Sequence, residues 1–222
     1  MKKSTFALSL IFWVFTCSVR GQFVSLTPKG GVTFSDFYTA TYAKSSFKTG
    51  MTFGILADYK LNKEKLFVKG ELGFEQKGTK YLDLYSMDAS ASSSGGSTYY
   101  TYNYINLPVL IKLKIGSKNN FFLNTGIYTG YLISGVERFK GTFEGQFIDQ
   151  KNAMNMQNHN RLDFGLAIGG GVGIPIVAKD KIMLEARYDF ALTTSNKSGS
   201  PLEPKQHTLE FTIGYEFGLK NK

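Results

Sequence analysis

The sequence predicts an all-β protein, specifically an eight-stranded antiparallel up-and-down transmembrane β-barrel with three short periplasmic turns and four longer extracellular loops. Three observations predict this fold. The chain begins with a segment typical of exported proteins, and eight later segments alternate apolar and polar residues with period two. The connections between these eight segments alternate between short and long, as they do in a meander that closes into a barrel.

The first residues have the organisation of a secretory signal peptide. Lys2 and Lys3 precede the apolar run FALSLIFWVF, and the small residues Val19 and Gly21 follow it. The run is too short for a membrane-spanning helix. We therefore expect cleavage of residues 1–21, which leaves residues 22–222 as one outer-membrane β-barrel domain.

Two alternatives for this segment remain open. One is a retained membrane anchor. The other is lipid attachment at Cys17, for which the preceding Val-Phe-Thr is a poor lipobox. Cleavage would remove Cys17 and Trp13, the single cysteine and tryptophan of the chain, so the mature protein could form no disulfide.

The charge balance excludes one class of partner. Cleavage removes Lys2, Lys3 and Arg20 and lowers the formal net charge from +9 to +6. The remaining basic residues are scattered and form no Lys/Arg-rich block of the kind that follows a nucleic-acid backbone. We expect no nucleic-acid partner.

The eight strands follow from the alternation, which gives each strand an apolar and a polar face. In LFVKGELGFEQK, for example, Leu72 and Phe74 lie opposite Glu71 and Glu75. In LDFGLAIGGGVGIPI the polar face is replaced by a file of small residues, which would leave room for bulky neighbours inside a narrow barrel. In chain order, the strands are expected at residues 24–35, 48–60, 66–77, 104–116, 121–134, 162–176, 182–192 and 208–219.

The segment YINLPVLIKLKIG at residues 104–116 combines a strand pattern with lysines. Its odd-numbered residues from Ile105 to Ile115 form one apolar row, whereas Lys112 and Lys114 belong to the opposite face. We expect both lysines to point into the barrel toward acids on the preceding strand, such as Glu71 and Glu75.

The same segment contains Pro108, which has no backbone N–H to donate to a ladder. A closed barrel offers no free edge where this loss would be harmless. We therefore expect a local bulge or a missing inter-strand hydrogen bond at Pro108.

The connections come in two sizes. Short polar turns are expected at residues 61–65, 117–120 and 178–181, and long loops are expected after Asp36, Asp83, Val136 and Thr193. Because the strand number is even, both termini should lie on the side of the short turns, in the periplasm.

The choice between a membrane barrel and a soluble barrel depends on which face meets water. The apolar faces carry few charges, whereas the opposite faces carry both signs and could pair inside a narrow interior. We expect aromatic girdles at the two membrane interfaces, formed by Tyr99, Tyr100, Tyr102 and Tyr104 at one end and by Phe67, Phe121 and Phe122 at the other. The final strand alternates Tyr215, Phe217 and Leu219.

These faces predict a structural charge network in the barrel interior. Its expected members are the charged residues on the polar faces of four strands: Lys69, Glu71, Glu75, Lys112, Lys114, Glu185, Arg187, Asp189 and Glu210.

Five segments resemble the PorT-like family of small outer-membrane β-barrel proteins. They are GGVTFSDF, GELGFEQKGTKY, YNYINLPVLIKLKIG, FFLNTGIYTGYLI and LDFGLAIGGGVGI, and they span nearly the whole mature chain. The resemblance implies an eight-stranded barrel in a Gram-negative outer membrane. It implies no single activity, because one namesake takes part in protein secretion and most members have no assigned task.

No catalytic, cofactor or metal site is predicted. The only histidines are His159 and His207, and a rim histidine could act with Asp163 or Asp189 and with Ser195 or Ser200, but no spacing enforces this arrangement. No Gly-x-Ser-x-Gly elbow and no second histidine at ligand spacing are present. We expect no enzyme and no cofactor.

The sequence therefore predicts an integral outer-membrane protein with a structural role or a loop-mediated binding role. Eight strands enclose an interior that side chains can fill, so we expect no wide pore. Membrane lipid is the expected partner, an envelope or secretion protein could bind the segment at residues 136–160, and the protein should be a monomer. The alternatives are an accessory component of a secretion or assembly machinery and a soluble lipocalin-like barrel that binds a ligand.

Overall fold

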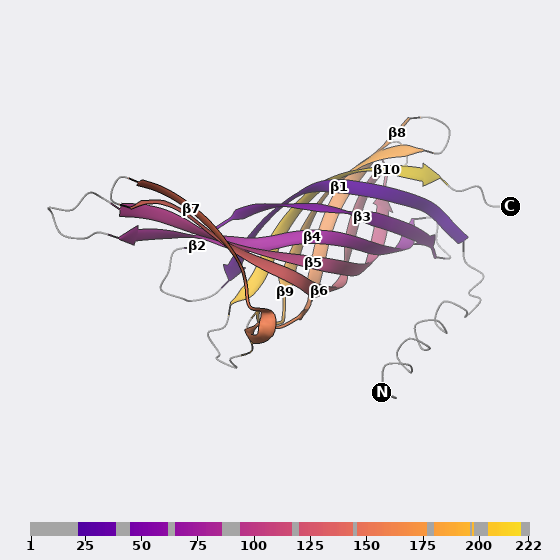
Figure 1. Ribbon diagram of the computed structural model, residues 1–222. Coiled ribbons are helices and arrows are strands. Elements are labelled where there is room, and N and C mark those ends of the chain that lie inside the picture. The colour runs from indigo at the N-terminus through magenta and orange to yellow at the C-terminus, as the bar shows by residue number, and fades with distance from the viewer. Residues whose placement is uncertain are drawn as a thin grey trace.

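Eight antiparallel strands form a closed ring in the computed structural model, which describes residues 22–38, 45–61, 65–85, 94–116, 120–143, 146–176, 180–195, 197 and 204–218 (Figure 1). The ring closes where β10 pairs with β1, from Ser25 opposite Gly218 to Tyr38 opposite Lys205. In ring order the strands are β1 (Gln22–Tyr38), β3 (Lys48–Lys60), β4 (Leu66–Tyr85), β5 (Ser94–Ile115), β6 (Asn120–Phe143), β8 (Leu162–Pro175), β9 (Lys181–Ala191) and β10 (Lys205–Gly218). The predicted all-β class and the eight strands are confirmed.

Among the described residues, three small elements lie outside the ring. Strand β2 (Ser45–Ser46) pairs with β4, strand β7 (Gln146–Ala153) pairs with β6, and η1 (Met156–Asn158) is a single 3-10 turn. Among the described residues, no helix is long and apolar enough to cross a membrane.

One end of the barrel carries the tight turns. The Leu61 N–H donates to the Leu66 carbonyl at 3.1 Å, and the Ile176 N–H donates to the Asp180 carbonyl at 3.0 Å. Gly116 directly follows β5 and has a φ of 80°, a left-handed backbone conformation that costs glycine little free energy. Strand β1 begins at this same end of the barrel, and strand β10 ends there.

At the opposite end, part of the barrel wall continues as a sheet that we call the overhang (Figure 1). It consists of residues 78–85 of β4, 94–103 of β5 and 134–143 of β6, together with β7. The expected loop after Val136 is therefore largely strand, and the described parts of the expected loop after Asp83, residues 83–85 and 94–98, are strand as well, which corrects the predicted boundaries. Alternating tyrosines in STYYTYNY favour continued pairing, because aromatic residues suit strands.

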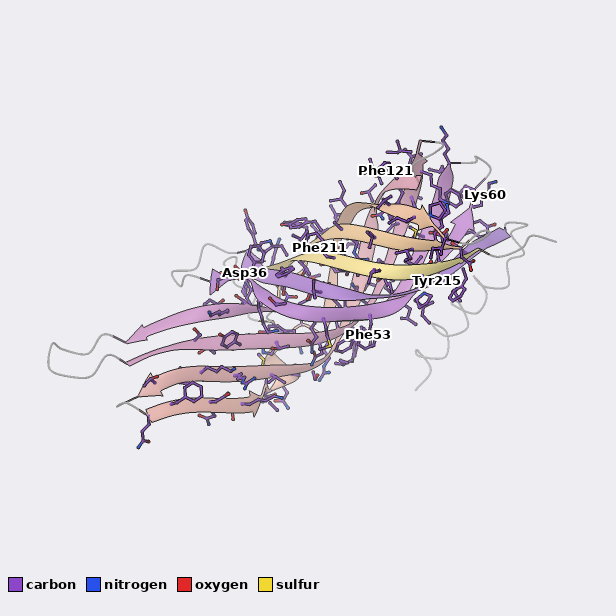
Figure 2. All side chains as sticks on the ribbon, turned by 90° about the horizontal axis from the view of Figure 1, so that it is seen from above. Asp36, Phe53, Lys60, Phe121, Phe211 and Tyr215 are labelled. Atoms are coloured by element: carbon purple, nitrogen blue, oxygen red, sulfur yellow. The ribbon has the colours of Figure 1, made fainter. Side chains whose placement is uncertain are left out.

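The two faces of the ring differ as predicted. Large apolar side chains point outward, and Figure 2 shows Phe53, Phe121, Phe211 and Tyr215 on the outside of the barrel. Val109, for example, is 45% exposed, whereas Lys112 on the same strand is 1% exposed. A lipocalin-like barrel would have its apolar face inside. The described interior is polar and charged instead, which removes support for that alternative.

The predicted aromatic girdles are wrong for most of the residues named. Tyr102 and Tyr104 are buried and pack with Phe37 and Leu132, and Phe67 and Phe122 also point inward. The two tyrosines point inward because side chains alternate between the two faces of a strand, and the even-numbered residues of β5 share the inward face of Lys112. Phe121 fits the prediction, because its side chain is exposed on the outside of the barrel next to the tight turns.

Pro108 interrupts pairing on one side of β5. On the β4 side the pairs Val109 opposite Gly70 and Asn106 opposite Gly73 flank the proline, with no pair between them. On the β6 side Pro108 pairs with Tyr128 without a register shift. The predicted loss of pairing is thus confirmed against β4.

The glycine file of β8 makes room for inward aromatic rings. A Cβ at Gly165 would lie 2.6 Å from the Tyr128 ring, and a Cβ at Gly171 would lie 2.6 Å from the Phe122 ring. Both contacts are closer than real side chains tolerate, so the predicted reason for these glycines is confirmed.

Candidate functional site

The middle of the barrel interior is occupied by a closed ring of ion pairs. Arg187 Nη1 lies 2.9 Å from Glu71 Oε2, and Arg187 Nη2 lies 2.7 Å from Glu210 Oε2. Lys29 Nζ contacts the other oxygens of the same carboxylates, Glu71 Oε1 at 2.7 Å and Glu210 Oε1 at 2.6 Å. Arg187 also contacts Asp189 at 3.0 Å. Two cations therefore hold two carboxylates from both sides.

A second pair crosses the interior beside this ring. Lys69 Nζ on β4 donates to Glu185 Oε1 on β9 at 2.6 Å. The amide of Asn124 on β6 donates to the same carboxylate oxygen at 2.9 Å. Three strands therefore meet at the Glu185 side chain.

Toward the tight turns, Lys112 is the central cation. Its Nζ lies 2.5 Å from Asp58 Oδ2 and 3.9 Å from Glu216 Oε2. The same Nζ lies 4.6 Å from the centre of the Phe122 ring. Carboxylates and an aromatic face together surround the buried ammonium group, as its charge requires.

Toward the overhang, Lys77 has the corresponding role. Its Nζ lies 3.0 Å from Asp163 Oδ2 and 3.7 Å from Glu75 Oε2. The Tyr128 ring centre lies 4.3 Å from this Nζ, and the Tyr104 ring centre lies 5.5 Å from it. Lys77 is thus enclosed by two carboxylates and two rings.

Several of these contacts join opposite walls of the barrel. In ring order, β4 and β9 lie four strands apart, as do β5 and β10. The pairs of Lys69 with Glu185, Arg187 with Glu71 and Lys112 with Glu216 therefore span the interior. At these levels side chains fill the space that an open channel would need.

Acidic residues outnumber basic residues among the buried charges that the structure describes. The bases are Lys29, Lys69, Lys77, Lys112 and Arg187, and the acids are Asp36, Asp58, Glu71, Glu75, Asp163, Glu185, Asp189, Glu210 and Glu216. Hydrogen bonds from neutral groups offset part of this excess. Asp36, for example, accepts from Thr79 Oγ1 at 2.5 Å, Ser45 Oγ at 3.1 Å and its neighbour Phe37 N–H at 2.7 Å.

One group of acids has ligand atoms close enough to hold a cation. Carboxylate oxygens of Glu75, Asp189 and Glu210 lie within 4.8 Å of one another. Glu75 Oε1 and Asp189 Oδ2 are buried and have no hydrogen-bond partner. Arg187 already contacts two of the three carboxylates, so it supplies positive charge to this group.

One known protein family matches most of this chain. The model of the family described as outer membrane protein beta-barrel domain matches residues 18–197. The chain belongs to this family. It is therefore an outer-membrane β-barrel protein, and its outward apolar face contacts membrane lipid.

Solved structures of other outer-membrane barrels are similar to this one. Neisserial surface protein A is 12% identical, with 87% of this chain and 97% of that chain covered and a TM-score of 0.42. Ail of Yersinia pestis, in complex with the heparin analogue sucrose octasulfate, is 18% identical over 88% and 100% of the two chains, with a TM-score of 0.39. OprG of Pseudomonas aeruginosa is 12% identical over 91% and 100%, with a TM-score of 0.39. No curated protein matches the sequence.

The structure places eight of the nine predicted network residues inside the outer-membrane barrel. Lys69, Glu71, Glu75, Lys112, Glu185, Arg187, Asp189 and Glu210 are all buried. Lys114 is half-buried near the tight turns, where its Nζ lies 4.4 Å from the Phe67 ring centre. No described carboxylate forms an ion pair with Lys114.

The expected partners of the two lysines on β5 are wrong. Lys112 pairs with Asp58 and Glu216, whereas Glu71 pairs with Lys29 and Arg187. The carboxylate of Glu75 accepts from the Asn106 amide, another inward residue of β5. The register explains this difference, because Lys112 lies opposite Phe67 on β4 and Glu75 lies opposite Tyr104, eight residues along β5.

Sequence reasoning missed Lys29, which holds two carboxylates of the central ring. The signal was present, because Thr27, Lys29 and Thr33 alternate along β1 and share its buried face. Asp58, Asp163 and Glu216 belong to the polar-face charges that the sequence predicted to pair inside the barrel, and Lys77 lies on the polar face expected for its strand. None of these four was among the nine residues named for the network.

Ser195, one of the candidate nucleophiles, lies beside His159, because the neighbouring Asn160 N–H donates to the Ser195 carbonyl at 3.0 Å. No described carboxylate forms an ion pair with either histidine, so the structure assembles no triad from these residues. His159 lies against the Tyr102 ring, with ring centres 5.6 Å apart, and its Nδ1 has no hydrogen-bond partner. Burial lowers the pKa of His159, which favours the neutral imidazole. His207 Nδ1 contacts the Tyr188 hydroxyl at 3.1 Å. Ser200 lies outside the described residues.

Proposed function

We propose that the protein is a non-catalytic, non-conducting barrel with a structural or binding role, and that its overhang makes the contacts outside the cell. The observation that carries this proposal is the pairing of charges across the interior, from β4 to β9 and from β5 to β10. A wide pore needs a continuous water-filled interior. Buried pairs such as Arg187 with Glu71 leave no such space at their level.

The proposal includes an orientation in the membrane. Both chain ends and the tight turns would lie in the periplasm, and the overhang would lie outside. This orientation is supported by the position of two strand ends, because β1 begins and β10 ends beside the tight turns. It is also supported by the usual periplasmic position of short turns in outer-membrane barrels. We further propose cleavage after residue 21, a single barrel domain over residues 22–222 and a monomeric state.

Surface labelling of introduced cysteines tests the orientation. Phe147 in β7 is 71% exposed on the overhang, and Lys65 is exposed beside a tight turn at the other end. In intact cells, a membrane-impermeant maleimide should label Phe147→Cys and leave Lys65→Cys unlabelled until the cells are lysed. The reverse pattern would contradict the orientation. The mass of the unmodified mature protein would show whether Cys17 is absent, as this design requires.

A second candidate is an accessory component of a secretion or assembly machinery, in line with the PorT-like resemblance. The free edge of β7 favours it, because within the described residues β7 pairs only with β6. An exposed strand edge can accept a strand from another protein. A photo-crosslinking residue at Phe147 should then capture one defined envelope protein in intact cells, whereas capture of only lipid and abundant porins would favour the structural role.

A further inference from the structure

The outer surface of the overhang contains a cleft of about 410 Å³, which we call the basic cleft. Its cations are Lys48, Arg138, Lys140 and Lys151, and Tyr99 is the aromatic residue of its lining. These side chains come from β3, β5, β6 and β7, so the cleft exists only because the wall continues beyond the barrel.

The strand register aligns part of this cleft in one row. Lys80 lies opposite Tyr99, Tyr99 lies opposite Arg138, and Arg138 lies opposite Lys151. Residues that face one another across neighbouring strands lie on the same side of the sheet. Lys80 Nζ also lies 5.5 Å from the Tyr99 ring centre. The row therefore presents three cations around one tyrosine.

The basic cleft lies on the same face of the sheet as the lipid-facing side chains. On β5, Tyr99, Thr101 and Asn103 continue the odd-numbered row of outward residues that begins with Ile105. The register against β6 shifts by one residue between Asn103 and Tyr104. This bulge moves the even-numbered Arg138 and Lys140 onto the outward face.

The positive charge of the basic cleft is only partly neutralised. Asp149 pairs with Arg138 at 2.6 Å and lies 4.0 Å from Lys140. Lys48 and Lys151 form no ion pair among the described residues. One carboxylate therefore faces four cations, and the cleft suits an anion.

We propose that the basic cleft binds the phosphate groups of the glycolipid in the outer leaflet beside the barrel. Two features favour a lipid over a soluble anion. The cleft lies directly beyond the apolar lipid-facing row on the same face of β5, and basic groups beside an apolar band attract anionic headgroups. Tyr99 adds an amphipathic ring of the kind that lies at membrane interfaces. This inference rests on the proposed orientation, which places the overhang at the outer leaflet.

Native mass spectrometry of the refolded full-length mature barrel in neutral detergent tests the proposal. The probe is diphosphorylated lipid A, titrated against the wild-type protein and a triple variant with Lys48→Gln, Lys140→Gln and Lys151→Gln. We expect the triple variant to bind the probe roughly a hundredfold more weakly, since each of the three cations near an anionic lipid surface contributes about 1 kcal/mol. Equal binding by the two proteins would overturn the proposal.

The matched control removes three lysines at the tight-turn end, with Lys60→Gln, Lys65→Gln and Lys181→Gln, and should bind like the wild type. Heat-dependent mobility on unboiled gels verifies that each variant is folded. Lipid A without phosphates should bind the wild type as weakly as diphosphorylated lipid A binds the triple variant. Equal affinity for the dephosphorylated lipid, or stronger binding of a soluble sulfated polysaccharide than of the lipid, would also overturn the proposal. Because the assay uses detergent, its outcome is independent of the cysteine labelling that tests the orientation.

Discussion

Lys69 on β4 and Glu185 on β9 meet across the barrel interior, with 2.6 Å between Lys69 Nζ and Glu185 Oε1. The two residues are 116 positions apart in sequence and lie on opposite sides of the ring. Both side chains are almost completely buried. The ion pair therefore joins opposite walls, and loss of either partner would leave a charge buried without its counterpart.

This pair predicts a non-additive effect of mutation. Lys69→Met should lower the free energy of unfolding by about 3 to 5 kcal/mol, because Glu185 would remain buried and unpaired. The double variant Lys69→Met with Glu185→Gln should recover much of this loss. Urea unfolding of the barrel in lipid vesicles measures both. Additive losses in the double variant would contradict the pairing.

Arg187 is predicted to be the most sensitive position of the interior. It contacts Glu71, Asp189 and Glu210, so Arg187→Leu would leave Asp189 without its ion-pair partner among the described residues and would leave Lys29 as the single cation of Glu71 and Glu210. We expect a larger loss of unfolding free energy than for Lys69→Met, measured in the same assay. A loss no larger than that of the exposed control Lys65→Leu would refute the central role of Arg187.

The assignment of faces predicts a position-dependent cost of introduced lysine. Val109 is an outward residue of the barrel wall, so Val109→Lys should cost about 2 to 4 kcal/mol of unfolding free energy in bilayers. Thr101, on the same face of β5 but in the overhang, should accept lysine at less than about 1 kcal/mol. Similar costs at both positions would mean that the overhang lies within the hydrocarbon.

Two glycines predict opposite responses to alanine. At Gly165 a Cβ would lie 2.2 Å from the Phe190 carbonyl oxygen, whereas at Gly70 no atom lies within 4 Å of a Cβ. Gly165→Ala should lower the unfolding free energy by about 1 to 3 kcal/mol, and Gly70→Ala should leave it unchanged or raise it. Heat-dependent gel mobility at increasing temperature compares the two variants. Equal transition temperatures would show that β8 has more room than the structure indicates.

The fold was predictable because its signals are local. Period-two alternation in segments such as residues 182–192 gives both the strand and its faces, and the connection lengths give the meander. The overhang was only partly predictable, because serine- and glycine-rich stretches such as residues 94–97 have weak strand propensity and pair because β4 and β6 lie on either side of them.

The partners inside the barrel were not predictable. Alternation places Lys112 on the inward face, but its partners Asp58 and Glu216 lie on strands that do not adjoin β5. Which residues share a level depends on the stagger of all eight strands. The residue pattern within each strand does not specify that stagger between strands.

The most direct test of the filled interior is the conductance of the purified barrel in a planar lipid bilayer. The pairs of Lys69 with Glu185 and Arg187 with Glu71 join opposite walls, so the account predicts no large, steady conductance. A steady open channel on the nanosiemens scale would contradict it.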